Sequence, residues 1–266
     1  MKSILSSVAC VLLLSSCAGA ESDVSAVTFN SSLPQGAIRV EKGFLPGRPS
    51  ALAWFPSAQP KAALLINPGA QIPAAAMADM GAAGAAAGYA TYIIENAANL
   101  PILPGNSDNI GEVAEILAKD PAQFKNLPKA MRIAHETGLK IYAIGHSMGG
   151  AVLTADIERT NSPLSGIILL GVSKLVAKPK SVQVPLTFAF GENDKVTSQP
   201  EIKVLAKELS ANTIKIEGVN HFCIVSDAKV GAAEFRARDG LALAGLNARN
   251  CADRVISTLN AAKILP

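Results

Sequence analysis

The chain has 266 residues, of which 49% are hydrophobic and 17% are charged, so it can bury a substantial interior and does not have the composition of a disordered protein. This length suits one large domain and does not require a second. The formal net charge is only +3, and the sequence has no basic run with interleaved aromatic residues, which excludes nucleic acid as an expected partner.

The N-terminus is typical of an export signal. Lys2 is followed by an apolar segment, residues 4–14, that is too short to span a bilayer, and then by small residues. The stretch Leu-Ser-Ser-Cys at residues 14–17 resembles the lipobox of bacterial lipoproteins, in which cleavage precedes a cysteine that becomes lipid-modified. We therefore expect a signal peptide over residues 1–16 and acyl chains on Cys17.

The lipobox resemblance also implies a location. Ala18 stands where an aspartate favours retention in the inner membrane, so we expect an anchor in the outer membrane that faces the periplasm. An ordinary cleaved signal with an unmodified Cys17 is the alternative. Residues 17–36 are small and polar and predict a tether, which leaves residues 37–266 for the folded domain.

Eight short apolar runs of the domain predict β-strands. They span residues 37–41, 51–55, 62–67, 89–95, 140–144, 166–171, 185–190 and 213–217. The first two are joined by a short turn that contains glycine and proline, so we expect them to be antiparallel. The later runs are separated by segments long enough for helices, as parallel strands require.

Helices are predicted between the later strands and after the last one. The expected ranges are 73–87, 108–119, 121–136, 151–159, 199–210 and 244–264. Residues 199–210 mix apolar side chains with lysines and glutamates at helical spacing, which predicts an amphipathic helix on the outside of the domain.

A glycine-flanked serine follows the fifth predicted strand. Residues 140–150 read K-I-Y-A-I-G-H-S-M-G-G, and residues 145–149 match the G-x-S-x-G nucleophile elbow, which turns a strand sharply into a helix. Glycines on either side let the strand and the helix approach a serine in strained backbone. Ser147 is therefore our candidate nucleophile.

This succession of elements resembles the α/β-hydrolase family: two antiparallel strands, then alternating strands and helices, with the serine turn after the fifth strand. The resemblance implies an α/β-hydrolase fold, with an eight-stranded, mostly parallel sheet flanked by helices. Only 13 residues, 172–184, separate the sixth and seventh predicted strands, where other members insert a lid. The chain is thus most similar to small bacterial members without a cap domain, the dienelactone-hydrolase-like group, and we expect an open active site.

A serine hydroxyl needs a general base within hydrogen-bond reach, and that base needs an orienting carboxylate. Of the three histidines, His135 lies in a predicted helix, where a solvated or capping role is expected. His146 precedes Ser147, and we expect it to point away from the site that the serine faces. His221 follows the eighth strand, where the family places its base; a structural loop histidine is the alternative.

The carboxylate is expected after the seventh strand. Residues 191–194 read G-E-N-D, which matches the family's G-x-x-D pattern and points to Asp194. The order Ser147, Asp194, His221 along the chain is the one expected for this fold. Glu192 and Asp227 are the alternative carboxylates, and an exposed loop carboxylate without a catalytic role is the other possibility for Asp194.

An oxyanion hole needs N–H donors from the residue after the nucleophile and from the loop after the third strand. Met148 supplies the first. In the loop N-P-G-A-Q, residues 67–71, a Pro-Gly pair replaces the family's usual His-Gly, so the second donor is expected to be Ala70, or Gln71 if the turn differs.

Cys223 and Cys251 remain in the exported domain, where an oxidising compartment permits a disulfide between them; two buried thiols are the alternative. The histidines complete no metal-ligand spacing, and no cofactor is expected.

The expected function is hydrolysis of a carboxylic ester of a small-molecule acyl substrate. Thioesters, lactones, amides and acyl transfer use the same groups. From a different class, a non-catalytic envelope lipoprotein that uses the fold as a binding module is the alternative.

Overall fold

The computed structural model describes residues 35–39, 51–95, 134–160, 164–175, 184–227, 233–240, 242 and 244–266. The chain divides into two compact units, Met1–Pro34 and Gln35–Pro266, and the first lies wholly outside the described residues. The predicted signal, the predicted lipidation site Cys17 and most of the predicted tether fall in that first unit. All the described residues belong to the second unit.

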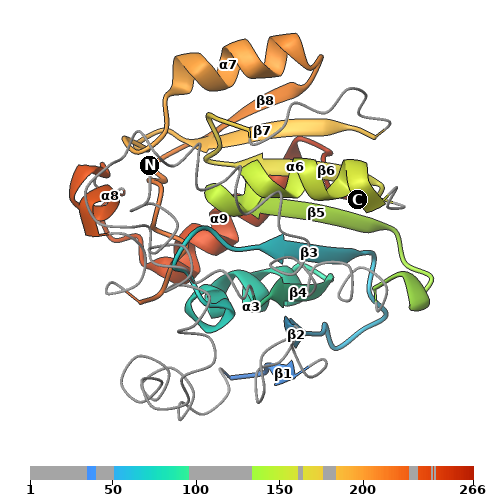
Figure 1. Ribbon diagram of the computed structural model, residues 1–266. Coiled ribbons are helices and arrows are strands. Elements are labelled where there is room, and N and C mark those ends of the chain that lie inside the picture. The colour runs from blue at the N-terminus through green and yellow to red at the C-terminus, as the bar shows by residue number, and fades with distance from the viewer. Residues whose placement is uncertain are drawn as a thin grey trace, which may run out of the picture. The chain divides into compact units, whose positions relative to one another are not determined.

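One eight-stranded sheet forms the centre of this unit (Figure 1). Its strands are β1 (Ile38–Arg39), β2 (Ala51–Trp54), β3 (Ala63–Asn67), β4 (Ala90–Ile94), β5 (Ile141–His146), β6 (Gly166–Leu170), β7 (Leu186–Gly191) and β8 (Asn212–Ile216). They lie in the order β1-β2-β4-β3-β5-β6-β7-β8. β1 pairs antiparallel with β2, β2 antiparallel with β4, and every other pair is parallel.

All eight predicted strands are confirmed, with small shifts at their ends. Residues 40–41 of the first predicted strand lie outside the described residues, and among the other strands the largest shift is in β5, which we expected to end at Ile144 and which continues through His146. The reason is that Gly145 still pairs with Asn67 and Leu169, and His146 with Leu170, so neighbours on both sides extend the ladder to the serine.

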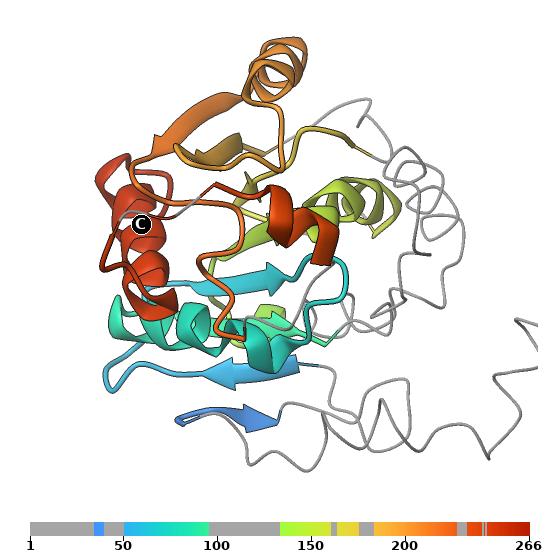
Figure 2. The ribbon, with the colours of Figure 1, turned by 90° about the vertical axis from the view of Figure 1, so that its left-hand side faces the viewer.

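Helices cover both faces of the sheet. They are the short 3₁₀ helix η1 (Ala74–Met77) and the α-helices α3 (Ala78–Ala86), α6 (Met148–Thr160), α7 (Gln199–Glu208), α8 (Ala233–Arg238) and α9 (Ala248–Ala261). Figure 2 shows α3 and α9 on one face and α6 on the other. α7 packs on the face of α6, because Ile202 and Ala206 belong to the same buried cluster as Leu153.

The central strand β3 shows how the two faces are divided. Leu64 and Ile66 belong to the hydrophobic cluster under α3 and α9, whereas Ala63 and Leu65 belong to the cluster under α6 and α7. All four are at most 1% exposed. A parallel strand covered on both faces reads as a continuous apolar run, which is why these strands could be found in the sequence.

The helix ends differ from the prediction for identifiable reasons. The last helix begins at Ala248 and not at residue 244, because the Asn247 side chain caps it by accepting the N–H of Asn250 at 2.9 Å. The range 73–87 divides into η1 and α3. The predicted helix 108–119 lies outside the described residues, as do residues 121–133 of the predicted helix 121–136 and residues 176–183 of the β6–β7 connection; residues 134–136 are helical, as expected. α8 was not predicted.

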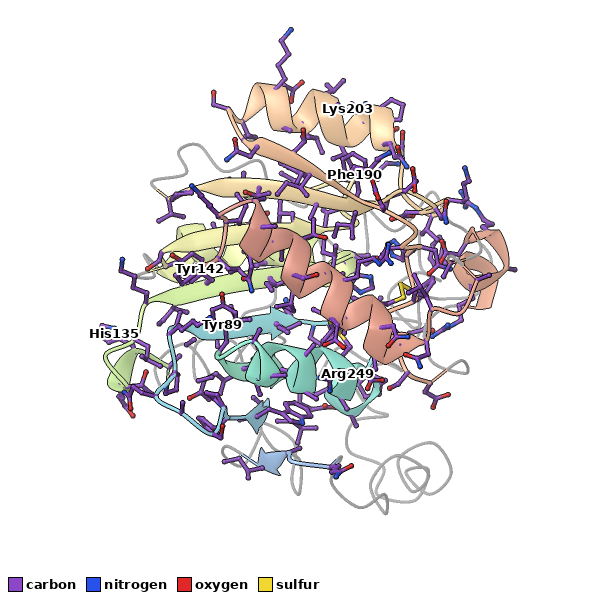
Figure 3. The ribbon with its side chains drawn as sticks, turned by 180° about the vertical axis from the view of Figure 1, so that it is seen from behind. Tyr89, His135, Tyr142, Phe190, Lys203 and Arg249 are labelled. Atoms are coloured by element: carbon purple, nitrogen blue, oxygen red, sulfur yellow. A yellow bond between two sulfur atoms is a disulfide. The ribbon has the colours of Figure 1, made fainter. Side chains whose placement is uncertain are left out.

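Cys223 and Cys251 form a disulfide, which joins the loop after β8 to the first turn of α9 and is drawn in yellow in Figure 3. No described helix has the length and apolar character that crossing a membrane requires.

Candidate active site

Ser147 lies in the turn between β5 and α6. Its φ of 51° is in the left-handed region that non-glycine residues rarely adopt. The turn is fixed on both sides: the Ser147 N–H donates to the carbonyl of Leu170 at 2.9 Å, and the Ser147 carbonyl accepts the N–H groups of Gly150 and Ala151 at 3.0 and 3.1 Å. Such a strained residue persists only where its surroundings determine it, and these are common at functional sites.

The glycines of the elbow are needed because β3, β5 and α6 approach closely there. A Cβ at Gly149 would overlap the carbonyl oxygens of Asn67 and Pro68. The Asn67 side chain also donates to the Gly149 carbonyl at 2.8 Å, which ties the end of β3 to the first turn of α6. The elbow predicted from residues 145–149 is therefore present, with the backbone that the motif requires.

The loop after β3 passes beside the serine. A Cβ placed on Gly69 would lie 3.1 Å from the Cβ of Ser147. The loop turns at once, since the Ile72 N–H donates to the Gly69 carbonyl at 3.2 Å and Gln71 has a φ of 58°. The Ala74 N–H that follows donates to the Glu95 carboxylate at 2.9 Å. The loop predicted to supply the second oxyanion donor therefore approaches Ser147 at Gly69, and Ala70 and Gln71 follow directly in its turn.

Asp194 follows β7 and is 3% exposed. Its Oδ1 accepts the N–H groups of Val196 and Thr197, both at 2.9 Å, and its Oδ2 accepts the Thr197 hydroxyl at 2.6 Å. Burial alone would raise the pKa of the Asp194 carboxyl. The hydrogen bonds from His221 and Thr197 outweigh burial and hold the pKa below its usual range, so the group is an anion near neutral pH.

His221 follows β8 and faces that anion. Its Nδ1 lies 2.9 Å from Asp194 Oδ2, and both side chains are at most 1% exposed. Because a carboxylate can only accept, Nδ1 carries the proton and Nε2 has the free lone pair. Among the described residues, Nε2 has no hydrogen-bond partner. The lack of a side chain at Gly171 makes room for the pair, since a Cβ there would lie 2.9 Å from His221 Nδ1.

His146 corrects one expectation. We expected its ring to point away from the site, but it is 1% exposed and packs against the His221 ring, with 4.8 Å between the ring centroids. Its Nε2 lies 3.0 Å from the His221 carbonyl, so Nε2 must carry the proton. Burial, with a contribution from His221, lowers the pKa of His146 to about 3, and the ring is neutral. The abrupt change of direction at Ser147 separates the two neighbouring side chains without taking His146 out of the site.

The alternative carboxylates lie in different surroundings from Asp194. Glu192 forms an ion pair with Lys215 at 2.9 Å and accepts the Gly218 N–H at 3.1 Å, and Asp227 is exposed. His135 is also exposed, as expected, and lies at the left margin of Figure 3, at the opposite end of the sheet from the disulfide.

Two residues that contact the site were missed by sequence reasoning. Thr197 bonds Asp194 through both its N–H and its hydroxyl. The spacing D-x-x-T at residues 194–197 is one in which an aspartate accepts bonds from residues just after it, and that pattern could have indicated Thr197. Asp239, which accepts the His221 N–H at 3.1 Å, comes after β8 with no motif around it beyond an Asp-Gly turn signal.

A small cavity adjoins the pair and is lined by His146, Asp194, Val219, Asn220 and His221, among others. It is smaller than most ligand pockets, so it does not define a substrate. Within the part of the chain that the structure describes, no three His, Cys, Asp or Glu side chains gather as a metal site.

The fold has known relatives among solved structures. Esterase 2 of Thermogutta terrifontis, in a form phosphorylated by paraoxon, is 15% identical, with 87% of this chain and 93% of that chain covered and a TM-score of 0.51. An alpha-beta serine hydrolase homologue from Coxiella burnetii is 13% identical, with 72% and 91% covered and a TM-score of 0.50. A Thermus thermophilus protein is 19% identical, with 70% and 90% covered and a TM-score of 0.50. At these identities the likeness concerns the fold alone.

Comparison of the sequence itself gives a family. No curated protein matches the chain. Residues 63–228, more than half of its length, match the family described as "Alpha/beta hydrolase family". The matched range contains the elbow, Asp194 and His221. Together with the eight-stranded sheet, this match shows that the chain belongs to the alpha/beta hydrolase family and has its fold.

Proposed function

We propose that the protein is a serine hydrolase that cleaves carboxylic esters through an acyl-enzyme, with Ser147 as nucleophile, His221 as general base and Asp194 as the carboxylate that orients it. The observation that carries the proposal is the buried pair of Asp194 Oδ2 and His221 Nδ1, 2.9 Å apart, at the edge of the sheet where the strained Ser147 follows β5. Chemistry of this kind needs a base whose tautomer is fixed, and Asp194 fixes it.

The reaction uses the lone pair of His221 Nε2, which is free of other hydrogen bonds from described residues. As the Ser147 oxygen attacks the ester carbonyl carbon, its proton passes to Nε2. The tetrahedral intermediate then collapses, and the same proton leaves with the alcohol, which breaks the ester bond. Water repeats the sequence on the acyl-enzyme and releases the acid.

The oxyanion is held by the N–H of Met148 and by an N–H of the loop after β3, at Ala70 or Gln71. Support comes from the close approach of that loop to Ser147 and from the left-handed Gln71, which turns the loop beside the nucleophile. Fixed N–H donors of this kind stabilise charge that develops only in the transition state.

Esters are the proposed substrate class because the structures of similar fold include an esterase that is phosphorylated by paraoxon. Paraoxon is an organophosphorus compound of the type that reacts with activated serines. We also propose that the protein is one of the small alpha/beta hydrolases without a substantial cap domain, because the connection between β6 and β7 is short. An open site of that kind would take a small acyl substrate without interfacial activation.

The test is hydrolysis of p-nitrophenyl esters over a series of acyl lengths. The purified protein should be active, and Ser147→Ala and His221→Ala should each lose about 10⁴-fold or more in kcat. His135→Ala is the matched control, because this exposed histidine lies away from the site and should leave kcat unchanged. Full activity in Ser147→Ala would overturn the proposed nucleophile.

Two other results would redirect the assignment. Protein that reacts with a fluorophosphonate but hydrolyses no ester in the series would keep Ser147 and replace the substrate, with thioesters and acyl transfer as the next classes to assay. Protein that neither hydrolyses nor reacts would favour a binding module.

The cell envelope is the proposed place of action, with residues 1–16 as signal, acyl chains on Cys17, and residues 17–36 as a tether to the domain at 37–266. Support comes from the lipobox-like sequence at residues 14–17. Metabolic labelling with a palmitate analogue should mark the protein and leave Cys17→Ala unmarked, and the labelled protein should fractionate with outer membranes. Equal labelling of both would contradict lipidation at Cys17.

A further inference from the structure

Asp239, in the first residue position after α8, binds the backbone of the base. Its Oδ1 accepts the N–H of His221 at 3.1 Å, and its Oδ2 accepts the N–H of Phe222 at 3.0 Å. One carboxylate therefore holds two successive N–H groups, one on each oxygen, at the residue whose ring is proposed to move the proton. Hydrogen bonds to a charged acceptor are among the stronger ones in proteins.

The segment around Asp239 also contacts the loop of the acid. Oδ1 lies 3.4 Å from the N–H of Lys195, the residue after Asp194. Gly240 packs against Asn193 so closely that a Cβ there would overlap the Asn193 carbonyl oxygen. The Gly240 carbonyl in turn accepts the side-chain amide of Asn220. Residues 239 and 240 thus lie between the loop after β7 and the loop after β8.

α8 adds a side-chain contact to the same loop. The Arg236 guanidinium lies over the Phe222 ring, 4.6 Å from its centroid. Figure 1 shows α8 beyond the carboxyl ends of the parallel strands, the edge at which the proposed site lies. Both ends of the His221 backbone are therefore bound by other segments, the N–H by Asp239 and the carbonyl by His146.

Helix stability does not explain an acidic residue at this position. Asp239 follows a helix whose last turn it continues, since its own N–H donates to the Phe235 carbonyl at 3.0 Å. A negative charge at the carboxyl end of a helix is unfavourable. Burial also raises the pKa of the Asp239 carboxyl, although the bonds from Phe222 and His221 act in the opposite direction. The carboxylate is thus kept where both effects oppose its charge, and it accepts four backbone N–H groups: two of the base loop, His221 and Phe222, one of Lys195 and one of Gly240.

We infer that Asp239 is a positioning residue: it fixes the backbone of His221 so that the ring keeps Nδ1 on Asp194 and presents Nε2 to the nucleophile. This inference rests on the proposed function and adds to it a fourth side chain that contacts neither substrate nor reacting atoms. A base held at its backbone keeps its place when substrate and product exchange, whereas a displacement of about 1 Å in an active site can lower the rate by about 100-fold.

The test is Asp239→Asn, in which an amide of the same shape presents an NH₂ group to one of the two backbone N–H donors. Asp253→Asn is the control, because it removes an aspartate on α9 that is bonded only to Arg249 among the described residues. Active sites are counted by fluorophosphonate titration, and kcat is expressed per titrated site. We expect Asp239→Asn to lower kcat per site by about 100-fold with KM within about twofold of the parent.

A merely structural role would give a different pattern. Destabilised Asp239→Asn would show fewer titratable sites and a lower Tm, while the sites that remain would turn over at the parental rate. That result, or kcat within about twofold of the parent, would overturn the inference and leave the proposed function intact.

A second readout does not depend on activity. In protein labelled with ¹⁵N-histidine, the Nδ1 proton of His221 should be protected from exchange by Asp194, and His146→Gln assigns the two buried rings. Asp239→Asn should shift this resonance and speed its exchange, and Asp253→Asn should not. An unchanged resonance would overturn the inference even if the parent proved to hydrolyse no ester.

Discussion

The two halves of the site are built in different ways. Around Asp194 and His221, the base side of the site, hydrogen bonds to side chains fix the geometry. Asp194 has four hydrogen bonds, and His221 is bonded at its ring, its N–H and its carbonyl. On the nucleophile side, Ser147 and Gln71 are in left-handed backbone, and the elbow depends on glycines that admit neighbouring carbonyls. The proposed base, His221, is placed by polar bonds, and the proposed nucleophile, Ser147, by backbone geometry.

This difference predicts how substitutions in each half affect turnover and stability. Polar bonds to a buried anion depend on charge and on single atoms, so substitutions on the base side should act on turnover before stability. A strained turn depends on the space around it, so added volume on the nucleophile side should act on stability and turnover together. Substitutions in both halves test this contrast, from the largest expected effect to the smallest.

Asp194→Asn should lower kcat by about 10⁴-fold, because an amide in place of the carboxylate can leave His221 in the wrong tautomer while its shape is kept. Thermal unfolding should show that the variant is folded. Glu192→Gln is the control, since Glu192 bonds Lys215 and Gly218 and not the base. A loss below about tenfold would contradict the proposed role of Asp194 as the carboxylate that orients His221.

His146 should make the protein sensitive to acid. Its folded pKa of about 3 lies below the ordinary histidine pKa of 6.5, so the unfolded chain binds a proton in this interval that the folded protein does not. The contribution to stability is therefore present above pH 6.5 and is lost as pH falls toward 3. The free energy of unfolding should drop by about 1.4 kcal/mol per pH unit from this residue between those limits.

His146→Gln isolates that contribution, because the amide keeps a donor for the His221 carbonyl and does not titrate. The free energy of unfolding is measured with urea at several pH values from 7 to 4. Its slope against pH should be smaller in the variant by the amount that uptake of one proton contributes. The depressed pKa of Asp194 acts in the same direction in both proteins, so it cancels from the comparison. Equal slopes would contradict a buried neutral His146.

Gly149→Ala should lower the free energy of unfolding by about 3 kcal/mol and also lower kcat, because the added methyl overlaps the carbonyls of Asn67 and Pro68 and displaces the loop beside Ser147. Gly138→Ala is the control. Gly138 has a φ of 70° but open space around it, so only backbone strain of about 1 kcal/mol is expected there, with no change in kcat. Similar effects of the two substitutions would show that close packing is not what the elbow requires.

The disulfide should stabilise the loop that carries His221, because it ties Cys223 of that loop to Cys251 of α9. Replacing both Cys223 and Cys251 with serine is expected to lower the free energy of unfolding by about 3 kcal/mol, because the bridge closes a loop across 28 residues of sequence. A reductant should lower the Tm of the parent toward that of the double variant and leave the variant unchanged. A parent Tm that does not respond to reductant would contradict this contribution.

Thr197→Val should have the smallest effect, about 1 kcal/mol in stability, because it removes the hydroxyl bond to Asp194 Oδ2 and keeps the backbone N–H bond to Oδ1. kcat should fall only several-fold. Thr197→Ser keeps the hydroxyl and should resemble the parent; if it behaved like Thr197→Val, the methyl and not the hydroxyl would be the contributing group.

The sheet and the elbow could be predicted from the sequence because each corresponds to a pattern of neighbouring residues. Buried parallel strands are continuous apolar runs, and Ser147 lies in a motif whose glycines have a steric reason. Asp194 and His221 were indicated by the family's pattern after the seventh and eighth strands, and they meet in the structure because the carboxyl ends of parallel strands lie at one edge of a sheet. The place of β4 between β2 and β3, by contrast, has no signal in the order of the chain.

The residues that support the base could not be predicted in the same way. Asp239 is 18 residues from His221, and the contact depends on how α8 returns over the site, which no local pattern reports. His146 was assigned to the wrong side because strand alternation does not apply across a residue with a positive φ. Long-range backbone contacts of this kind appear only once the chain is folded.

The central claim is that Ser147 is an activated nucleophile. The most direct measurement is mass spectrometry of the folded protein after reaction with a fluorophosphonate, with peptide mapping of the adduct. Our account predicts one adduct, on the peptide that contains Ser147, which is absent after heat denaturation and in Ser147→Ala and forms far more slowly in His221→Ala. An adduct on another residue, or none on protein that hydrolyses esters, would contradict it.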